Sequence, residues 1–375
     1  MTVLHSQKSL RHIYADYNAT TPLRPDARTA ILEVLNGPGN PSSVHMAGRR
    51  ARSSIEKARG QLSELIGCSR NSIIFTSGGT ESDVLALRGS GCENILISSI
   101  EHDAVRSAFW GAKQIPVLGN GILNVDVLER LVSGMPRPYL VSVMWANNET
   151  GAIQPIKEVR EIVTRYGGFV HVDAVQALGK IPLNFMESGV DMISLSAHKI
   201  GGPPGVGALV VRDGFKLDSI FSGGGQENGR RSGTENLTGI VGFGAAAEAC
   251  LKYSYERKQV TRLRDLFESR ISDVSSDAQI ICKDVERLGN TSAISMPGMA
   301  AETQVMAFDI EGIAVSAGAA CSSGKVKQSH VLKAMNLKDE IASNTIRISF
   351  GWENTEEEVE QVASVWQRLY KRAMK

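Results

Sequence analysis

The chain has 375 residues, of which 41 are basic and 40 acidic, giving a formal net charge of +1 at pH 7. This balance argues against a broad electrostatic surface for nucleic acid, so no nucleic-acid partner is expected. No apolar run approaches the roughly 18 residues that a membrane-spanning helix needs, so we expect no membrane partner either. The five cysteines are widely spaced without a C-x-x-C pair, which favours neither a disulfide framework nor a zinc site. A reducing cytoplasm is the expected compartment.

Helical and strand patterns alternate from about residue 40 to residue 196. Residues 40–67 have the pattern of a capped amphipathic helix that ends at Gly67. A β-rich run at 72–77 then leads into a helix at 78–89. The elements that follow are strands at 94–99, 114–118, 139–146, 169–174 and 190–196, and helices at 124–134 and 155–168. Because the strands are apolar on both faces and separated by helices, they predict a mostly parallel sheet covered on both sides.

The pattern changes after about residue 236. Residues 235–274 predict one long helix or two that lead away from the sheet. Residues 354–375 predict a closing helix, at whose start Thr355 and Glu358 have the spacing of a capping box. Further strands are expected at 278–283, 291–296 and 344–350. We therefore place a change of domain near residue 255.

Polar residues follow the expected carboxyl ends of several strands. Five such clusters occur, namely Gly78-Gly79-Thr80, His102, Asn147-Asn148, Asp173 and Ser196-Ala197-His198-Lys199. In an open α/β sheet, this edge is where ligands bind. A single cluster would mean little, but five at one edge predict a binding or catalytic site.

The glycine-rich run SGGTES, at 77–82, has the properties of an anion cradle. Its glycines allow the backbone to approach a ligand closely, and the free N–H groups of a helix start point at a phosphate. The structural alternative is a tight turn with Thr80 as the N-cap. The run matches neither the P-loop nor the dinucleotide-binding pattern, so it gives little support to a nucleotide.

Asp173 ends a buried run, where a bare carboxylate is costly and a protonated ring nitrogen would supply a partner. The alternative is an N-cap for the residues that follow it. His102 either stacks on a ring or simply ends a strand. Lys199 would be desolvated at this edge, which lowers the pKa of an amine and makes it nucleophilic, whereas most lysines are solvated. A phosphate cradle, a carboxylate, a stacking histidine and a desolvated lysine together describe pyridoxal 5'-phosphate (PLP) held as a Schiff base.

Several longer segments resemble the cysteine desulfurases of the NifS/IscS type, which belong to class V of the fold-type I PLP enzymes. The matching segments include FTSGGTESD, EHDAV, NNETGAIQPI, HVDAVQALGK, SAHKIGGPPGVGAL, GGGQENGRRSGTEN and SAGAACSSG. The resemblance runs in order from about residue 13 to the C-terminus and is specific, because the segments are long and their order and spacing agree. Pro204 departs from the family pattern, which often has a lysine there, at a position beyond the cofactor.

The resemblance implies an α/β protein of the PLP-dependent transferase fold type I. A large PLP-binding domain would span residues 16–255 and contain a mostly parallel seven-stranded sheet covered by helices. Residues 1–15 and 256–375 would form a smaller α+β domain that carries a mobile cysteine loop at about 316–330. The implied assembly is a homodimer with shared active sites.

The resemblance also implies roles for the matched positions. Lys199 would carry the PLP Schiff base, Asp173 would pair with the ring nitrogen, and His102 would stack on the ring and move protons. Arg347 would bind the substrate carboxylate through its planar fork. Asn148 and Gln176 would contact the substrate side and the ring oxygen of the cofactor. Thr80, Ser196, His198 and, reaching over from the second subunit, Thr234 would hold its phosphate, and Gly79 would also bind the cofactor.

Cys321 lies in SAGAACSSGKVKQSH, whose small residues and glycines predict a mobile loop. The resemblance implies the long loop of the NifS/IscS group, in which Cys321 takes sulfur from L-cysteine as a persulfide and leaves L-alanine. The persulfide would pass by thiol exchange to a sulfur-acceptor protein such as an iron–sulfur cluster scaffold. No resident metal is expected, although the Cys321 persulfide would be able to contact a nascent iron–sulfur cluster.

Three other activities remain open for these residues. An aminotransferase on the same scaffold would need no cysteine in the loop. A selenocysteine lyase would break an equivalent bond between Cβ and the chalcogen. A catalytically silent member would act as a sulfur-transfer or assembly partner, which the intact set of Lys199, Asp173, His102 and Cys321 argues against.

Overall fold

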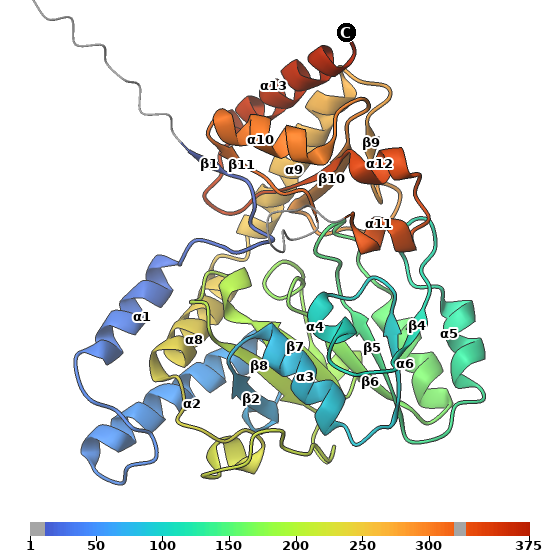
Figure 1. Cartoon of the computed structure of the whole chain (residues 1–375). Coiled ribbons are helices and arrows are strands. Elements are labelled where there is room, and N and C mark those ends of the chain that lie inside the picture. Colours follow the sequence, from blue (N-terminus) through green and yellow to red (C-terminus); the bar gives the residue numbers. More distant parts are fainter. Residues whose placement is uncertain (1–11, 319–327) are drawn as a thin grey trace, which may run out of the picture.

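The computed structural model describes residues 12–318 and 328–375, and its largest sheet has seven strands in the order β2-β8-β7-β6-β5-β3-β4 (Figure 1). The strands of this sheet are β2 (Ile73–Thr76), β3 (Asn94–Ser98), β4 (Lys113–Ile115), β5 (Tyr139–Met144), β6 (Phe169–Asp173), β7 (Met192–Ser196) and β8 (Gly207–Val211). Neighbours from β4 to β7 pair in parallel, whereas β8 pairs antiparallel with both β2 and β7. The prediction of a mostly parallel seven-stranded sheet is confirmed.

Helices cover both faces of this sheet. They are α1 (Pro25–Leu35), α2 (Met46–Ile66), α3 (Gly79–Gly89), α4 (Asp103–Arg106), α5 (Val125–Val132), α6 (Ile156–Arg165), α7 (Phe185–Ser188) and α8 (Leu237–Lys252), with 3-10 turns η1 (Arg70–Ser72), η2 (Ala197–Lys199) and η3 (Gln226–Gly229). Val141 of β5 belongs to an apolar cluster with Leu62 of α2 and Phe243 of α8. The adjacent Leu140 belongs instead to a cluster with Leu85 of α3. Since side chains alternate between the faces of a strand, the sheet is buried on both sides.

The C-terminal part has two small sheets and an apolar core of its own. Strands β12 (Thr345–Ser349), β10 (Thr291–Ser295) and β9 (Gln279–Ile280) pair antiparallel, and β1 (Ile13–Tyr14) pairs in parallel with β11 (Ile313–Ala314). Its helices are α9 (Glu256–Ser272), α10 (Ala301–Ile310), α11 (His330–Ala334), α12 (Asp339–Ser343) and α13 (Glu356–Ala373). The core of this part includes Ile13, Phe267, Phe308, Ile348 and Trp366.

The predicted elements of this half agree with the structure except at one strand. The helical pattern at 235–274 is two helices, α8 and α9, and the capping box of Thr355 and Glu358 is confirmed. The strand expected at 278–283 is wrong beyond Ile280, because Cys282 takes a left-handed backbone conformation with a φ of 58°. The division into domains near residue 255 stays a prediction.

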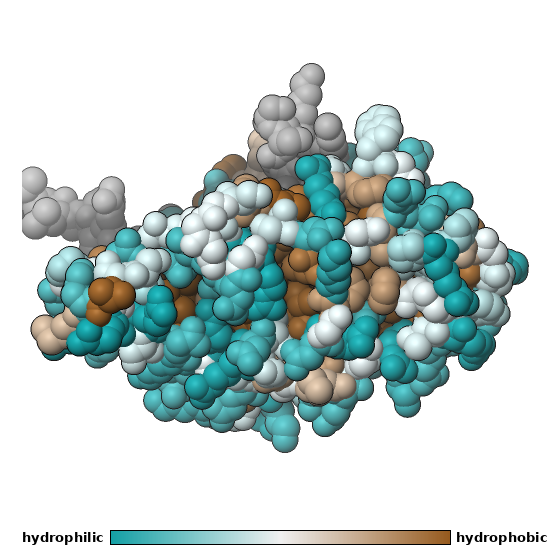
Figure 2. All heavy atoms as spheres, turned by 90° about the horizontal axis from the view of Figure 1, so that it is seen from below, coloured by the Kyte–Doolittle hydropathy of each residue, from teal (hydrophilic) through white to brown (hydrophobic). Residues whose placement is uncertain are grey.

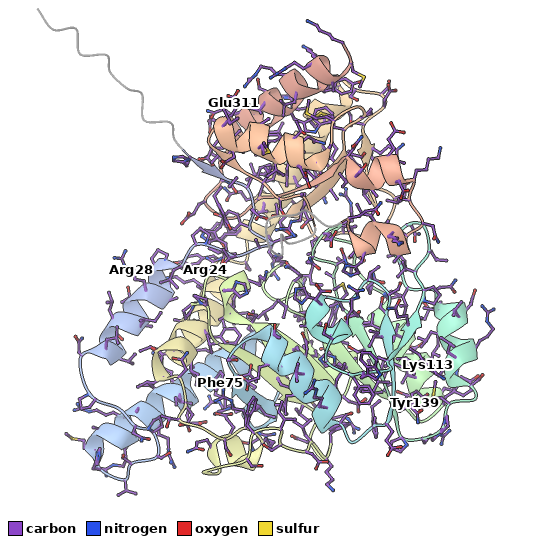
Figure 3. The ribbon with its side chains drawn as sticks, viewed as in Figure 1. Arg24, Arg28, Phe75, Lys113, Tyr139 and Glu311 are labelled. Atoms are coloured by element: carbon purple, nitrogen blue, oxygen red, sulfur yellow. The ribbon has the colours of Figure 1, made fainter. Side chains whose placement is uncertain are left out.

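Arg24 lies at the junction between the seven-stranded sheet and the C-terminal part (Figure 3). Its Nη2 donates to Oε2 of Glu256 in α9 at 2.6 Å, and its guanidinium lies 3.9 Å from the ring centroid of Trp352. Its Nε also donates to the carbonyl oxygen of Ile200, at 3.1 Å. One buried side chain therefore connects three segments that are far apart in the sequence.

The face of the molecule in Figure 2 is mostly hydrophilic, with hydrophobic residues visible near its centre. Across residues 12–318 and 328–375, no helix is both long and apolar enough to cross a membrane.

Candidate active site

A cavity of about 830 Å³ lies at the carboxyl ends of the central strands. Met144, Asp173 and Ser196, which end β5, β6 and β7, line it, and Arg347 reaches it from β12 of the other sheet. Its volume falls in the range typical of small-molecule sites. Among the predicted site residues, the structure brings together in this cavity Gly79, Thr80, His102, Asn148, Asp173, Gln176, Ser196, His198, Lys199 and Arg347.

Two predicted residues are not part of this group. Thr234 lies in a different hollow, with Phe75, Glu227 and Arg231. Cys321 lies outside the described residues. The proposed roles of both therefore rest on the sequence.

The glycine turn brings the start of α3 against the cavity wall. A Cβ added to Gly79 would lie 2.8 Å from Cγ2 of Val175, closer than real side chains approach, so only glycine fits there without a shift. The N-cap of α3 is Gly78, with no side-chain cap, so the alternative of Thr80 as N-cap is wrong. The first N–H groups of a helix have no intrahelical partner and favour an anion. With Ser196 and His198 on the same cavity, this turn is suited to a phosphate.

Asp173 presents a buried carboxyl at the end of β6. Its Oδ1 accepts a hydrogen bond from the N–H of Val175 at 2.9 Å, and a turn rather than a regular helix follows. Burial raises the pKa of Asp173, while the charges of His102 and Lys199 oppose that rise. A cationic group in the cavity would hold this carboxyl ionised.

His102 both caps a helix and lines the cavity. Its Nδ1 accepts the N–H of Ala104 at 3.1 Å, so in the neutral ring the proton is on Nε2. The two readings from the sequence are thus compatible, because the capping contact fixes the orientation and tautomer of the ring.

Lys199 follows β7 in the short turn η2. Its Nζ donates to the carbonyl oxygens of Asn18 and Ala19, at 2.6 and 2.8 Å. Burial, with the positive charge of Arg347, lowers the pKa of Lys199 to about 8. This is the direction that desolvation predicts, and it increases the fraction of nucleophilic amine near neutral pH. Burial and the neighbouring Lys199 similarly lower the pKa of His198 to about 4, so that ring is neutral.

Arg347 is anchored through both terminal nitrogens of its guanidinium. Its Nη1 donates to the carbonyl oxygen of Asn148 at 2.9 Å, and its Nη2 donates to Oδ1 of Asp16 at 2.6 Å. Its Nε is buried and has no hydrogen-bond partner within the described residues. An unpaired donor on a rigid cation is suited to a carboxylate ligand.

Several buried polar groups around the cavity were not predicted from the sequence. Glu101 accepts the N–H of Met144 at 2.6 Å, and burial together with the charge of Asp173 raises the pKa of Glu101 well above its usual value. The same two causes raise the pKa of Asp83, whose side chain lines the cavity. Glu149 accepts the hydroxyl of Ser329 at 2.5 Å, and burial raises its pKa too. The sequence feature that would have indicated them is an acidic residue inside each of three motifs: Asp83 in ESD, Glu101 in EHD and Glu149 in NNETG.

These residues fit PLP. The close approach at Gly79 and the helix start suit its phosphate, the buried carboxyl of Asp173 suits a protonated ring nitrogen, and the desolvated amine of Lys199 suits covalent attachment. No group of three or more metal-ligating side chains occurs within residues 12–318 and 328–375.

An open α/β sheet with a small-molecule cavity at the carboxyl ends of its strands, suited to PLP, is the arrangement of a PLP-dependent enzyme. The chain belongs to the family described as aminotransferase class-V, whose model matches residues 13–362. Among individual relatives, the cysteine desulfurase IscS of Dictyoglomus turgidum is 40% identical over 374 residues, which cover 96% of this chain and 94% of that protein. A cysteine desulfurase of Cereibacter sphaeroides is 41% identical over 371 residues, covering 95% of each chain.

Solved structures agree with this assignment. The NifS-like protein from Rickettsia africae superposes with a TM-score of 0.89 at 34% identity, covering 96% of this chain and 99% of that one. Another NifS-like protein superposes with a TM-score of 0.87 at 35% identity, covering 96% of this chain and 99% of that one. The predicted fold class and family are therefore confirmed.

Proposed function

We propose that this protein is a PLP-dependent cysteine desulfurase that converts L-cysteine to L-alanine and transfers the sulfur to Cys321 as a persulfide. The observation that carries the proposal is the convergence of Asp173, Lys199 and Arg347 on one cavity from different strands and turns. The two desulfurases that share about 40% identity over nearly the whole chain support the choice of substrate.

PLP would be held covalently by Lys199 and through its ring nitrogen by Asp173. Its phosphate would lie against Gly79, Thr80 and the side chains of Ser196 and His198. When bound, the cofactor supplies an electron sink for the negative charge left when the Cα proton of cysteine is removed.

The substrate would be bound and deprotonated by residues of the cavity. Arg347 would hold the carboxylate of L-cysteine, using the Nε donor that has no partner in the described structure. Lys199 would take up the Cα proton, because its lowered pKa makes the neutral amine accessible. His102 would hold or move a proton at Nε2, the nitrogen that its capping contact leaves free.

Sulfur transfer would be the work of Cys321. Its thiolate would form an S–S bond to the substrate sulfur as the Cβ–S bond of cysteine breaks, and Cβ would then take up a proton to complete alanine. The persulfide would pass to an acceptor protein such as an iron–sulfur cluster scaffold. We also propose a cytoplasmic homodimer with shared active sites, in which Thr234 reaches the phosphate of the second subunit.

The test is the release of alanine and sulfide from L-cysteine by the PLP-loaded protein, with Cys321→Ser in parallel. Cys68→Ser is the matched control, because burial raises the pKa of that half-buried thiol to about 12 and leaves it inert. We expect alanine from the wild type and from Cys68→Ser, and its loss in Cys321→Ser. Alanine that persists in Cys321→Ser would contradict the persulfide step and favour direct elimination or transamination. A comparison of the reaction rates with cysteine and with selenocysteine distinguishes a cysteine desulfurase from a selenocysteine lyase.

A further inference from the structure

Lys180 is a half-buried residue whose amine the proposed chemistry does not use. It lies seven residues after Asp173, in the segment that follows β6. Its Nζ contacts Oε1 of Gln176 at 2.6 Å and Oδ1 of Asn18 at 2.7 Å. Within the described residues, no carboxylate lies close enough to form an ion pair with it. A buried lysine without a counter-ion is costly and calls for an explanation.

The surroundings of Lys180 favour the uncharged amine. Burial lowers the pKa of Lys180 well below its usual value, and the positive charges of Lys199 and Arg347 lower it further. A neutral amine has two N–H groups, and the structure provides two acceptors for them. Lys180 therefore acts as a pair of hydrogen-bond donors toward Gln176 and Asn18.

The contact with Lys180 fixes the orientation of the Gln176 side-chain amide, with its oxygen toward Lys180 and its nitrogen toward Asn18. The Nε2 of Gln176 donates to the carbonyl oxygen of Asn18 at 2.9 Å, and Lys180 occupies its Oε1. A flipped amide would place two oxygens against each other at Asn18 and lose both contacts. The second N–H of Nε2 is then the group that Gln176 has left to offer to the cavity it lines.

Asn18 connects this network to the catalytic lysine. Its carbonyl oxygen accepts both Nε2 of Gln176 and Nζ of Lys199, the latter at 2.6 Å. Its side-chain oxygen accepts Lys180 and, at 2.9 Å, the amide of Asn290. Lys180 thus donates to both Gln176 and Asn18, and Asn18 in turn accepts a hydrogen bond from Lys199.

We propose that Lys180 is a positioning residue, whose amine holds Gln176 and Asn18 so that Gln176 presents an N–H donor to the ring oxygen of the cofactor. The inference rests on the proposed function, since it needs PLP in this cavity. A ring oxygen that carries negative charge is stabilised by a donor and repelled by the amide oxygen. Without Lys180, Oε1 of Gln176 would be buried without a partner, and the amide would lose its fixed orientation.

The experiment measures PLP binding to the apo-protein and the visible absorption spectrum of the bound cofactor. Variants are Lys180→Met, Gln176→Met and the double variant. Lys113→Met, on the exposed edge strand β4 (Figure 3), is the control for the same chemical change. We expect Lys180→Met to weaken PLP binding roughly tenfold, the size of one lost hydrogen bond to a charged group. The spectrum should change as it does in Gln176→Met, and Lys180→Met should have no further effect in the Gln176→Met background.

A second variant keeps the proposal testable if Lys180→Met folds poorly. Lys180→Gln retains an N–H donor and should recover part of the PLP affinity and the wild-type spectrum. The positioning role would be overturned if the losses of PLP affinity in Lys180→Met and Gln176→Met simply added in the double variant. It would also be overturned if Lys180→Met lowered the melting temperature but left the PLP affinity unchanged. Failure of the wild type itself to bind PLP covalently would overturn the proposed function as well, so the two failures are distinguishable.

Discussion

Arg347 and Asp16 form an ion pair of 2.6 Å between β12 and the segment that follows β1, with the arginine side chain almost fully buried. The pair joins residues 331 positions apart in the chain. With the carbonyl oxygen of Asn148 on Nη1, it holds the guanidinium plane in one orientation at the cavity. A guanidinium fixed in this way can offer its remaining donor, Nε, to a carboxylate in one orientation.

Arg347→Lys should therefore raise KM for L-cysteine by roughly tenfold or more, because a lysine supplies the charge but not the planar fork. Steady-state alanine formation gives the measurement, with kcat expected to change less than KM. Arg368→Lys, at an exposed position of α13, is the control. A variant with unchanged KM would show that the carboxylate binds elsewhere.

The rate of covalent PLP capture by the apo-protein should rise with pH with a midpoint near 8. Burial lowers the pKa of Lys199 to about 8 from the 10.5 of a free lysine, and only the neutral amine attacks the aldehyde. The absorbance change after PLP addition, followed between pH 6 and pH 10, measures this midpoint. Lys199→Ala should lack the covalent phase. A midpoint near 10 would mean that the amine is solvated.

Gly79→Ala should weaken PLP binding roughly tenfold, because the new Cβ would lie 2.8 Å from Cγ2 of Val175 and displace the start of α3 from the phosphate site. Adding Val175→Ala removes the clash and should recover most of the affinity. Gly134→Ala is the control, since a Cβ there meets nothing within 4 Å. Equal PLP affinity in all of these variants would argue against a phosphate at this turn. Fluorescence titration of the apo-protein supplies the dissociation constants.

Arg24→Met should lower the free energy of unfolding by about 3 kcal/mol, through loss of a buried ion pair and of the stacking on Trp352. Part of this loss of stability arises because the carboxylate of Glu256 would be left without its partner. Urea unfolding measures the change. Arg28→Met is the matched control, because Arg28 lies four residues further along the chain, in α1, and its side chain is exposed (Figure 3). Similar effects of both substitutions would contradict the bracing role of Arg24.

His171 should make the fold sensitive to acid. The ring is buried between the hydroxyls of Ser142 and Ser194, each at 2.9 Å, with Oδ1 of Asp83 at 3.7 Å. Burial lowers the pKa of His171 to about 3, so between pH 6.5 and 3 the unfolded chain binds a proton that the folded chain does not. Unfolding free energy should therefore fall as pH falls through this window, by up to about 1.4 kcal/mol per pH unit.

The test compares His171→Gln with the wild type in urea at pH 7, 6 and 5. The stability advantage of the wild type should shrink as pH falls, because the variant has no imidazole to protonate on unfolding. The exposed His12→Gln is the control for the same chemical change. The raised pKa values of Asp83 and Glu101 act in the opposite direction, and the comparison between variants removes their common contribution. A constant difference across the three pH values would show that folding does not shift the pKa of His171 and would contradict the prediction.

Local patterns in the sequence predicted most of the central sheet. Strands such as β5 and β6 are mostly apolar runs of six and five residues, and the polar residues at or just after their ends marked the edge where the cavity lies. Strand β8 was not predicted, although it is as buried as its neighbours. It runs antiparallel between β2 and β7, which depends on its partners rather than on its own residues. The helices α1 and α10 were missed as well.

By itself, the sequence determined the alternation of strands and helices, the capping box of α13 and the positions of Asp173 and Lys199 at strand ends. These features depend on residues within one or two turns of each other, so a local pattern contains them. Only the tertiary structure decided that Asn18 and Asp16 lie beside Lys199 and Arg347, and that the amine of Lys180 contacts the side chain of Asn18. Burial and charge pairing arise from segments brought together by the fold, and the pKa of each group follows from that environment.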